Sequence, residues 1–405
     1  MSVCKRIQIF KNIPTLLLMI LAIINSGCPL GTIYYNYISI TLFAISVSVF
    51  LFKCRSVSIR QLQYVMALNT LVLLSMGINL DFDLSHYTGV ILNYLSVLFL
   101  VSVIDFREFC KWYVNVLFVI CLYSLVLTII YTLSKSIVQA LPVFSFESSG
   151  RWAHFHYIYY IWGGYSSIWT TIIRNSGFFR EPGVFSAHIC MALIIISSVN
   201  LKIIKSMRTR IIYVVIMVLT GLTTMSSVGV IGSLMCMLFY IRKEKLRYFK
   251  PILFFSLAVV AVYFVWDNHL ILLSKLSINS YQYASFGERI NGIVSAFDVW
   301  QENLLLGRGY NYFQSRKNGV STFFFFDMGA KHGILFALIF CYGIYCFLRN
   351  VSDSKSAFIL NFMIYSMFLI TQGLVDVPVF MALQMYCLRP FPAHEYKNKA
   401  LGGTS

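Results

Sequence analysis

Three charged residues lie close together at the end of a long polar segment, just before an apolar stretch begins. Arg174, Arg180 and Glu181 fall within eight residues, and Pro182 and Gly183 follow directly. A charge at the edge of a membrane-embedded stretch is costly unless it is paired or used, and the arginine fork binds phosphate oxygens in pairs. We therefore expect Arg174 and Arg180 to bind an anionic group. The alternative is that an arginine pairs with Glu181 to fix a helix start at Pro182.

The segment upstream of this cluster combines a cation with aromatic side chains. Arg151 and Trp152 open a run that holds further aromatic residues, namely Phe155, Tyr157, Trp162, Tyr165 and Trp169. Flat aromatic faces beside hydroxyl groups suit sugars, whose rings present apolar faces and polar edges. Aromatic residues that rest at the level of lipid headgroups would give the same pattern.

A second polar segment carries further basic residues and one histidine. Arg289 is followed by Arg308, which Gly307 and Gly309 flank, and this spacing predicts a tight turn that presents a cation. The turn is not a nucleotide-binding loop, because no Lys-Ser or Lys-Thr follows it. His332 stands at the start of the next apolar stretch. It could act as a base or be an ordinary interfacial residue.

Other classes of site lack support in the sequence. There is no His/Cys cluster with metal-ligand spacing and no Gly-x-Ser-x-Gly motif, so we expect neither a metal nor a cofactor. The ten cysteines are spread through apolar stretches, which does not suggest a disulfide framework. The spans contain no chain of acidic residues of the kind that proton-driven transporters use, and Asp376 is a single exception.

The composition indicates the elements that position these residues. Of 405 residues, 59% are hydrophobic and only 12% are charged, against about 25% in a typical soluble domain. Mean hydropathy is +0.75. The net charge of +17 falls in short runs between apolar stretches, which is a topology signal of membrane proteins and not a nucleic-acid-binding surface.

Apolar stretches recur along the whole chain and predict an all-α, polytopic membrane protein with about twelve transmembrane helices. They are residues 13–30, 33–52, 62–80, 88–104, 112–133, 183–200, 211–224, 228–241, 251–266, 328–348, 356–373 and 377–388. If both termini are cytoplasmic, most of the 32 basic residues lie on the inside. We expect one membrane domain over 1–405, with two large outer loops at 134–182 and 267–327 that contain short helices.

At these residues the chain resembles the Wzy-type O-antigen polymerases, within the superfamily that also contains the O-antigen ligases. The resemblance covers roughly residues 170–345 by motif and the whole chain by topology. It rests on Arg174-x-x-Gly177-x-x-x-Glu181-Pro182-Gly183, Thr223-Thr224-Met225-Ser226-Ser227, Arg289…Asn303-x-x-Leu306-Gly307-x-Gly309, and Asp327…His332-Gly333.

The resemblance implies a C-type glycosyltransferase at the periplasmic face of a bacterial inner membrane. The growing glycan on undecaprenyl pyrophosphate would pass to the non-reducing end of a new lipid-linked repeat unit. Membrane lipid and a chain-length regulator would be further partners, without nucleic acid. The implied catalytic residues are Arg180, Glu181 and His332. The implied residues that bind pyrophosphate or glycan are Arg174, Arg151, Arg289, Arg308, Trp152, Gly177, Pro182 and Gly183.

Three other functions remain open at this point. A ligase would move finished glycan to lipid A-core, but Gly333 follows His332 where ligases tend to have a small amide or hydroxyl residue. A lipid-linked oligosaccharide flippase would need charges inside the spans, whereas here arginines gather in long loops. In a structural or regulatory membrane protein the arginine clusters would have no chemical role.

Overall fold

The protein is described by a computed structural model, and the description covers twelve segments of the chain. These are residues 3–53, 55–134, 136–137, 143–148, 151–156, 160–162, 174–198, 201, 203–243, 281–316, 323–371 and 374–388. The expected span at 251–266 lies outside them.

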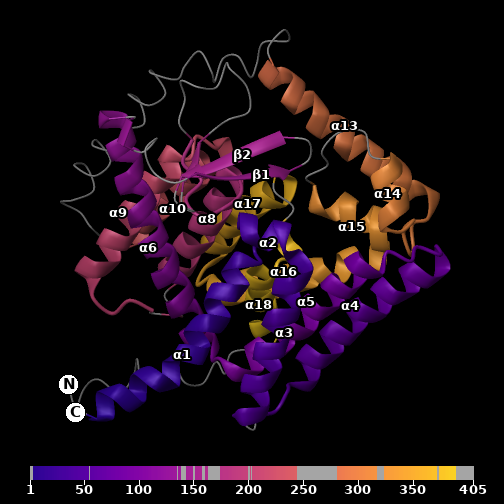
Figure 1. Ribbon diagram of the computed structural model, residues 1–405, viewed down its shortest axis with the longest axis horizontal. Coiled ribbons are helices and arrows are strands. Elements are labelled where there is room, and N and C mark those ends of the chain that lie inside the picture. The colour runs from indigo at the N-terminus through magenta and orange to yellow at the C-terminus, as the bar shows by residue number, and fades with distance from the viewer. Residues whose placement is uncertain are drawn as a thin grey trace.

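The N-terminal half consists of six helices in sequence, drawn in indigo to purple in Figure 1. They are α1 (Val3–Ile24), α2 (Pro29–Ile33), α3 (Tyr35–Phe52), α4 (Ile59–Ile78), α5 (Leu84–Val103) and α6 (Phe106–Leu133). The sequences of these helices are rich in Leu, Ile, Val and Phe, which favours helices in an apolar solvent, where every backbone group must bond within its own segment.

The C-terminal half begins at the arginine cluster and is also helical. Its elements are α8 (Pro182–Ser197), α9 (Met207–Thr223), α10 (Ser227–Lys243), α13 (Tyr281–Glu302), α14 (Tyr310–Arg316), α15 (Phe324–His332), α16 (Ile334–Val351), α17 (Lys355–Thr371), the 3₁₀ turn η1 (Leu374–Asp376) and α18 (Pro378–Tyr386).

The helices have the length and composition of membrane-embedded elements. In the described part of the chain, five are long and apolar enough to cross a membrane, within α3, α4, α5, α6 and α16. Shorter apolar helices lie within α1, α8, α10 and α17. The chain is therefore a multi-pass membrane protein, as the composition predicts.

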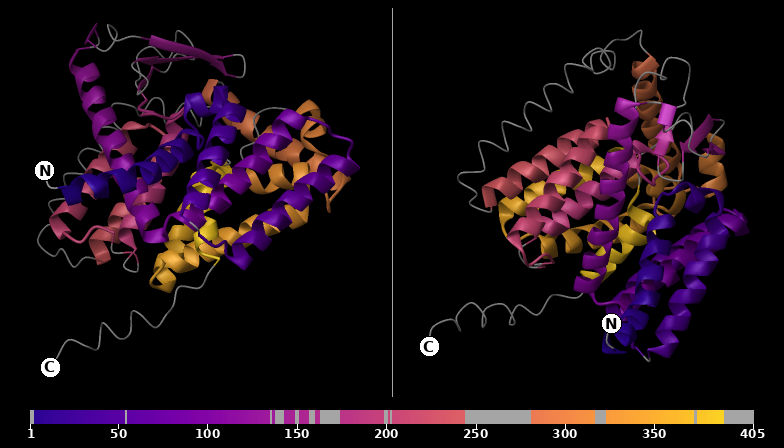
Figure 2. Two further views of the ribbon diagram at one scale, coloured as in Figure 1. Left: turned by 60° about the horizontal axis from the view of Figure 1, so that its bottom comes forward. Right: turned by 60° about the vertical axis from the view of Figure 1, so that its left-hand side comes forward.

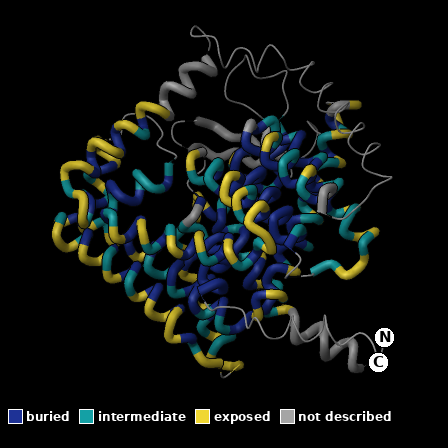
Figure 3. The backbone as a smooth tube through the Cα atoms, turned by 180° about the vertical axis from the view of Figure 1, so that it is seen from behind, coloured by how far each residue is buried: buried dark blue, intermediate teal, exposed yellow. Residues whose placement is uncertain are grey.

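Helix α8 lies at the centre of the molecule. Every residue from Gly183 to Ile196 is buried, and α6, α9, α10 and α17 pack around it. Figures 1 and 2 show these helices as one bundle, and Figure 3 shows exposed residues mainly along the outer helices. A helix that is apolar on all sides is expected in such a central position.

Two of the expected spans are interrupted in the structure. The predicted stretch 328–348 divides at Gly333 (φ 85°), so that α15 ends at His332 and only α16 has the length of a span. Helix α1 ends at Ile24, inside the first predicted stretch of 13–30, and the short helix α2 separates α1 from α3. Hydropathy alone does not reveal such breaks, because the residues on both sides of each break are apolar.

The first large loop differs from the expected short helices. Its described part forms a three-stranded antiparallel sheet of β1 (Val143–Ser148), β2 (Arg151–His156) and β3 (Tyr160–Trp162), in the order β1-β2-β3. Ser148 pairs with Arg151, and His154 pairs with Trp162. The aromatic residues that suggested a sugar or headgroup surface are also residues that favour strands.

Candidate functional site

The backbone of Arg180 is fixed by the break between α1 and α2. The Arg180 amide donates a hydrogen bond to the carbonyl of Gly27 at 2.9 Å. Gly27 has a φ of 117°, and a Cβ atom there would lie 2.6 Å from Val184 Cγ1 in the first turn of α8. Only glycine adopts this conformation at no steric cost, so Gly27 allows the break to approach the arginine closely.

The break itself is fastened to two further helices. The Ser26 carbonyl accepts a hydrogen bond from Nε2 of His188 in α8 at 2.9 Å. The Ser26 hydroxyl accepts one from the Val379 amide in the first turn of α18 at 3.0 Å. His188 and Val379 are both fully buried, so these hydrogen bonds fix the break, and with it the backbone of Arg180, to the core.

The side chain of Arg180 has an unused donor. Its Nε atom is buried and has no hydrogen-bond partner, and the hydroxyl of nearby Ser176 is in the same condition. Among the residues whose side chains the structure describes, Arg180 and the exposed Glu181 form no ion pair with each other. A buried unsatisfied donor is costly in a native protein, and it marks a place where an absent acceptor would bind.

The predicted arginine motif packs against the polar stretch at 223–227. Arg174 Nε donates to the Thr224 carbonyl at 3.4 Å. The Asn175 amide donates to the Thr223 carbonyl, and its side chain donates to Thr223 Oγ1, both at 3.0 Å. The structure thus brings together two motifs that are about fifty residues apart in sequence, and it sets Arg174 at the turn between α9 and α10.

Four motif residues around the arginines also have a role in the local structure. Gly177 has a φ of 53°, and a Cβ atom there would lie 2.7 Å from the Phe185 ring. Pro182 is the first residue of α8, as the sequence predicts, and Glu181 is its N-cap without a side-chain capping bond. Gly183 is buried in the first turn of α8.

A partly buried acidic residue is acted on by the charges of two basic residues that are far apart in the sequence. Asp376 lies in η1, between α17 and α18 and outside both helices. Burial raises the pKa of its carboxyl, while the charges of Lys331 and Arg180 act in the opposite direction. Arg180 lies near the end of the first large loop, and Lys331 lies in α15, just after the second, so cations from two regions of the sequence act on one carboxyl group. This arrangement was not predicted, although a lone acid in an apolar stretch was the signal for it.

His332 is enclosed by aromatic rings. It is 2% exposed, and its ring centroid lies 4.7 Å from that of Phe336 and 6.3 Å from that of Tyr87. Its Nδ1 atom is buried without a hydrogen-bond partner. Burial and the neighbouring charge of Lys331 lower the pKa of His332 well below 6.5, so the imidazole is neutral at pH 7 and a weaker base than a free histidine.

Arg308 lies in the predicted tight turn but has local partners. Gly307 and Gly309 both have positive φ, 67° and 84°, which confirms the turn. Arg308 forms an ion pair with Glu302 at 3.0 Å and stands over the Tyr312 ring at 4.6 Å from its centroid. Its backbone amide donates to the Ala330 carbonyl in α15 at 2.7 Å. The turn is thus fixed to the helix that carries Lys331.

An acidic residue missed in the sequence holds this region to the bundle. Asp81, in the connection between α4 and α5, accepts hydrogen bonds from the Asn311 amide at 2.9 Å and the Asn311 side chain at 2.8 Å. It also accepts one from the Tyr87 hydroxyl at 2.9 Å. The carboxylate therefore caps the N-terminus of α14 from another part of the chain. A cap from a distant segment cannot be predicted from the local sequence around α14.

The remaining predicted site residues are described by their backbone. The backbone of Arg151 and Trp152 forms the start of β2, and that of Arg289 lies in α13, while their side chains lie outside the described part. In the described residues, no group of three or more His, Cys, Asp or Glu is arranged to hold a metal ion.

Comparison with known proteins identifies no relative. No protein-family model, no curated protein and no solved structure matches this chain.

Proposed function

We propose that this chain polymerises lipid-linked oligosaccharide repeat units at the outer face of a bacterial inner membrane. The proposal includes about twelve spans, with both termini in the cytoplasm. The observation that carries it is the buried Nε of Arg180, which has no hydrogen-bond partner. The charges of Arg180 and of a second cation, Lys331, both act on the carboxyl of Asp376. A site of this kind suits an anionic group brought to the surface of a membrane.

The reaction would break one bond and form another. The bond between the donor glycan's anomeric carbon and the pyrophosphate oxygen breaks, and its electron pair stays on the pyrophosphate. The same carbon forms a bond with a hydroxyl oxygen of the acceptor unit, and a base takes the hydroxyl proton. Fixed cations accelerate such a step because negative charge develops on the leaving group. Arg180 and Lys331 would supply this stabilisation.

Two residues could accept the acceptor's proton. Glu181 is exposed and directly follows Arg180, so a hydroxyl from outside can reach it. His332 is neutral but almost fully enclosed. A base must come within hydrogen-bond reach of the hydroxyl. We therefore assign the proton transfer to Glu181 and not to the enclosed His332.

The test is the surface glycan of a strain that lacks the gene. A polymerase deletion leaves lipopolysaccharide with core plus a single repeat unit, and a plasmid copy restores the ladder of bands. Complete loss of surface glycan with accumulation of long lipid-linked chains would identify a ligase instead. An unchanged ladder would exclude both.

A further inference from the structure

The short connection between α4 and α5 exposes large apolar side chains. Leu80, Phe82 and Leu84 are 73%, 63% and 66% exposed. The residues that alternate with them are Asp81 and Asp83, whose carboxylates accept hydrogen bonds from protein groups. Because successive side chains of an extended segment point to opposite sides, both acids face the protein and the three apolar side chains face away from it.

The backbone at Leu80 is unusual for a leucine. Its φ is 50°, which lies in the left-handed region where Gly and Asn are the common turn residues. In a connection that faces water, either of those residues would adopt this conformation at lower cost. A leucine at this position indicates that the apolar side chain itself is used.

A second segment exposes apolar side chains at the same end of α4. Leu304 and Leu305, in the turn between α13 and α14, are 52% and 64% exposed. Asn79, the C-cap of α4, donates a side-chain hydrogen bond to the Gly307 carbonyl at 3.2 Å, so this turn lies against the connection. We call the five exposed residues of the two segments the lip: Leu80, Phe82, Leu84, Leu304 and Leu305.

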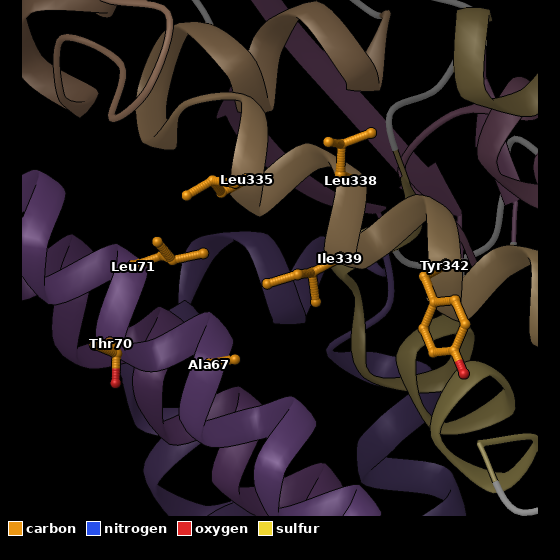
Figure 4. A pocket seen from close by; sticks show the side chains of 7 residues that line it. All are labelled: Ala67, Thr70, Leu71, Leu335, Leu338, Ile339 and Tyr342. Carbon is orange, nitrogen blue, oxygen red and sulfur yellow. The ribbon is translucent and has the colours of Figure 1, made fainter.

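The lip continues the apolar outer surface of α4. Both α4 and α5 have the length and composition of membrane spans, so their connection lies where the chain leaves the bilayer. On α4, the last exposed residues before the connection are also large and apolar, and they include Leu74 and Ile78. Figure 4 shows Leu71 of α4 and Leu335 of α16 on either side of an open, apolar hollow between these two spans. Apolar side chains thus extend without interruption from the spans to the lip.

We propose that the lip is inserted among the lipids of the bilayer and anchors this end of the molecule at the level of the headgroups. Exposed apolar patches mark contacts with a membrane or with another protein, and continuity with the outer surface of α4 favours the membrane. Interfacial segments bury their apolar side chains about 5–10 Å into the boundary between headgroups and acyl chains. The proposal concerns contact with lipid and does not rest on the proposed function.

The lip also sets the depth of the residues at the end of α15. Ser75 of α4 donates a hydrogen bond to the Lys331 carbonyl at 2.7 Å, and the Ile334 amide donates one to the Leu304 carbonyl at 2.9 Å. Both bonds tie the junction of α15 and α16 to segments that carry the lip or adjoin it. Insertion of the lip therefore holds Lys331 and His332 close to the level of the headgroups.

The test is a footprint of the unmodified full chain in lipid nanodiscs with two reagents. A lipophilic aryl diazirine labels side chains in the acyl region, and hydroxyl radicals oxidise side chains that meet water. Mass spectrometry should find the diazirine on the lip, as on the exposed Leu73 and Leu74 of α4, with little oxidation at either place. Arg316, an exposed residue of α14, should show the reverse pattern.

A charge in the lip should displace it from the lipids. Phe82→Asp should lower the diazirine labelling of Leu80 and Leu84 about fivefold, which corresponds to roughly 1 kcal/mol in the free energy of insertion. Gln314→Asp makes the same change in charge at an exposed residue of α14 and is the matched control, for which labelling of the lip should change little. Full labelling of the lip in Phe82→Asp would contradict the proposal.

Two footprints of the native chain would also overturn the assignment, so the test does not depend on the folding of a variant. Strong oxidation of the lip would show that it faces water. Absence of both modifications would show that protein covers it, as in a complex with a second copy of this chain. No glycan transfer is measured, so the result is independent of the gene-deletion test.

Discussion

Arg180 differs from Arg308 in what its side chain contacts. Arg308 is balanced by Glu302 and the Tyr312 ring, whereas the Nε of Arg180 is buried without an acceptor. Sequence spacing predicted both arginines as binding residues and could not separate them, because the partners of Arg308 were not evident from sequence. The sequence did indicate the cluster around Arg180, since charges beside an apolar stretch are rare without a use.

Asp81 provides a prediction about stability. Asp81→Ala would leave the Asn311 amide, the Asn311 side chain and the Tyr87 hydroxyl without their acceptor. We expect a loss of about 1.5–3 kcal/mol, the range for hydrogen bonds to charged groups. The measurement is thermal or denaturant unfolding of the purified protein in detergent.

The matched control for Asp81 is Asp83→Ala. Asp83 accepts a single capping bond from the His86 amide at 3.0 Å, so its loss should cost only about 1 kcal/mol. If the two substitutions prove equally mild, Asp81 does not hold α14 to the bundle.

His332 provides a prediction about pH. The pKa of His332 is about 6.5 in the unfolded chain and well below 6.5 in the folded protein. At a pH between the two pKa values, the unfolded chain binds a proton that the folded chain does not. Stability should therefore fall as the pH drops below about 6.5. His332→Phe suits the surrounding rings of Phe336 and Tyr87 and should show a weaker decline in unfolding temperature between pH 7.5 and 5. Identical pH profiles for the two proteins would contradict the assignment.

At the scale of elements, the apolar stretches of the sequence predicted where helices lie, but not where those helices break. The break at residues 25–28 and the division at Gly333 are stabilised by contacts with distant segments. Ser26 is bound by His188 and Val379, and a Cβ atom at Gly333 would lie 1.9 Å from the Leu305 carbonyl oxygen. Such long-range contacts determine where a helix ends, and a local run of apolar residues gives no sign of them.

Gly27 tests whether the break positions Arg180. Gly27→Ala adds a Cβ atom that collides with the Val184 side chain at a residue with positive φ, so either Val184 or the segment must shift. We expect a loss of about 1–2 kcal/mol in stability, from the cost of the left-handed conformation, and a larger loss of polymerisation because Arg180 moves with the segment. Gly77→Ala is the control, because a Cβ atom there meets nothing within 4 Å and alanine favours the α4 helix.

The comparison between the two alanine variants decides the point. If Gly27→Ala lowers stability but leaves the glycan ladder intact, then the break supports the fold without positioning Arg180 for the reaction.

At the scale of the whole molecule, composition and hydropathy predicted a multi-pass membrane protein, and the apolar helices agree. Sequence could not predict that residues 174–175 would pack against 223–224, or that the charges of Arg180 and Lys331 would both act on Asp376. Their proximity depends on how the helices pack around α8. Twelve spans with both termini inside remain a prediction of charge counting, which treats each apolar stretch as one crossing.

This topology can be checked with single cysteines in a background without native ones. Gln314 in α14 and Asp353 between α16 and α17 are both exposed and belong to opposite sides of the predicted arrangement. A membrane-impermeant maleimide should label Gln314→Cys in intact cells and Asp353→Cys only after permeabilisation. The reverse pattern would place the candidate site in the cytoplasm.

The most direct measurement of the central claim is the lipopolysaccharide ladder of a strain that carries Arg180→Ala. Removal of one fixed donor to a developing negative charge costs about 10²–10³-fold in rate, so the ladder should collapse to core plus a single repeat unit. Arg208→Ala, at an exposed arginine at the start of α9, should keep the full ladder. A full ladder with Arg180→Ala, at normal expression and insertion, would contradict the account.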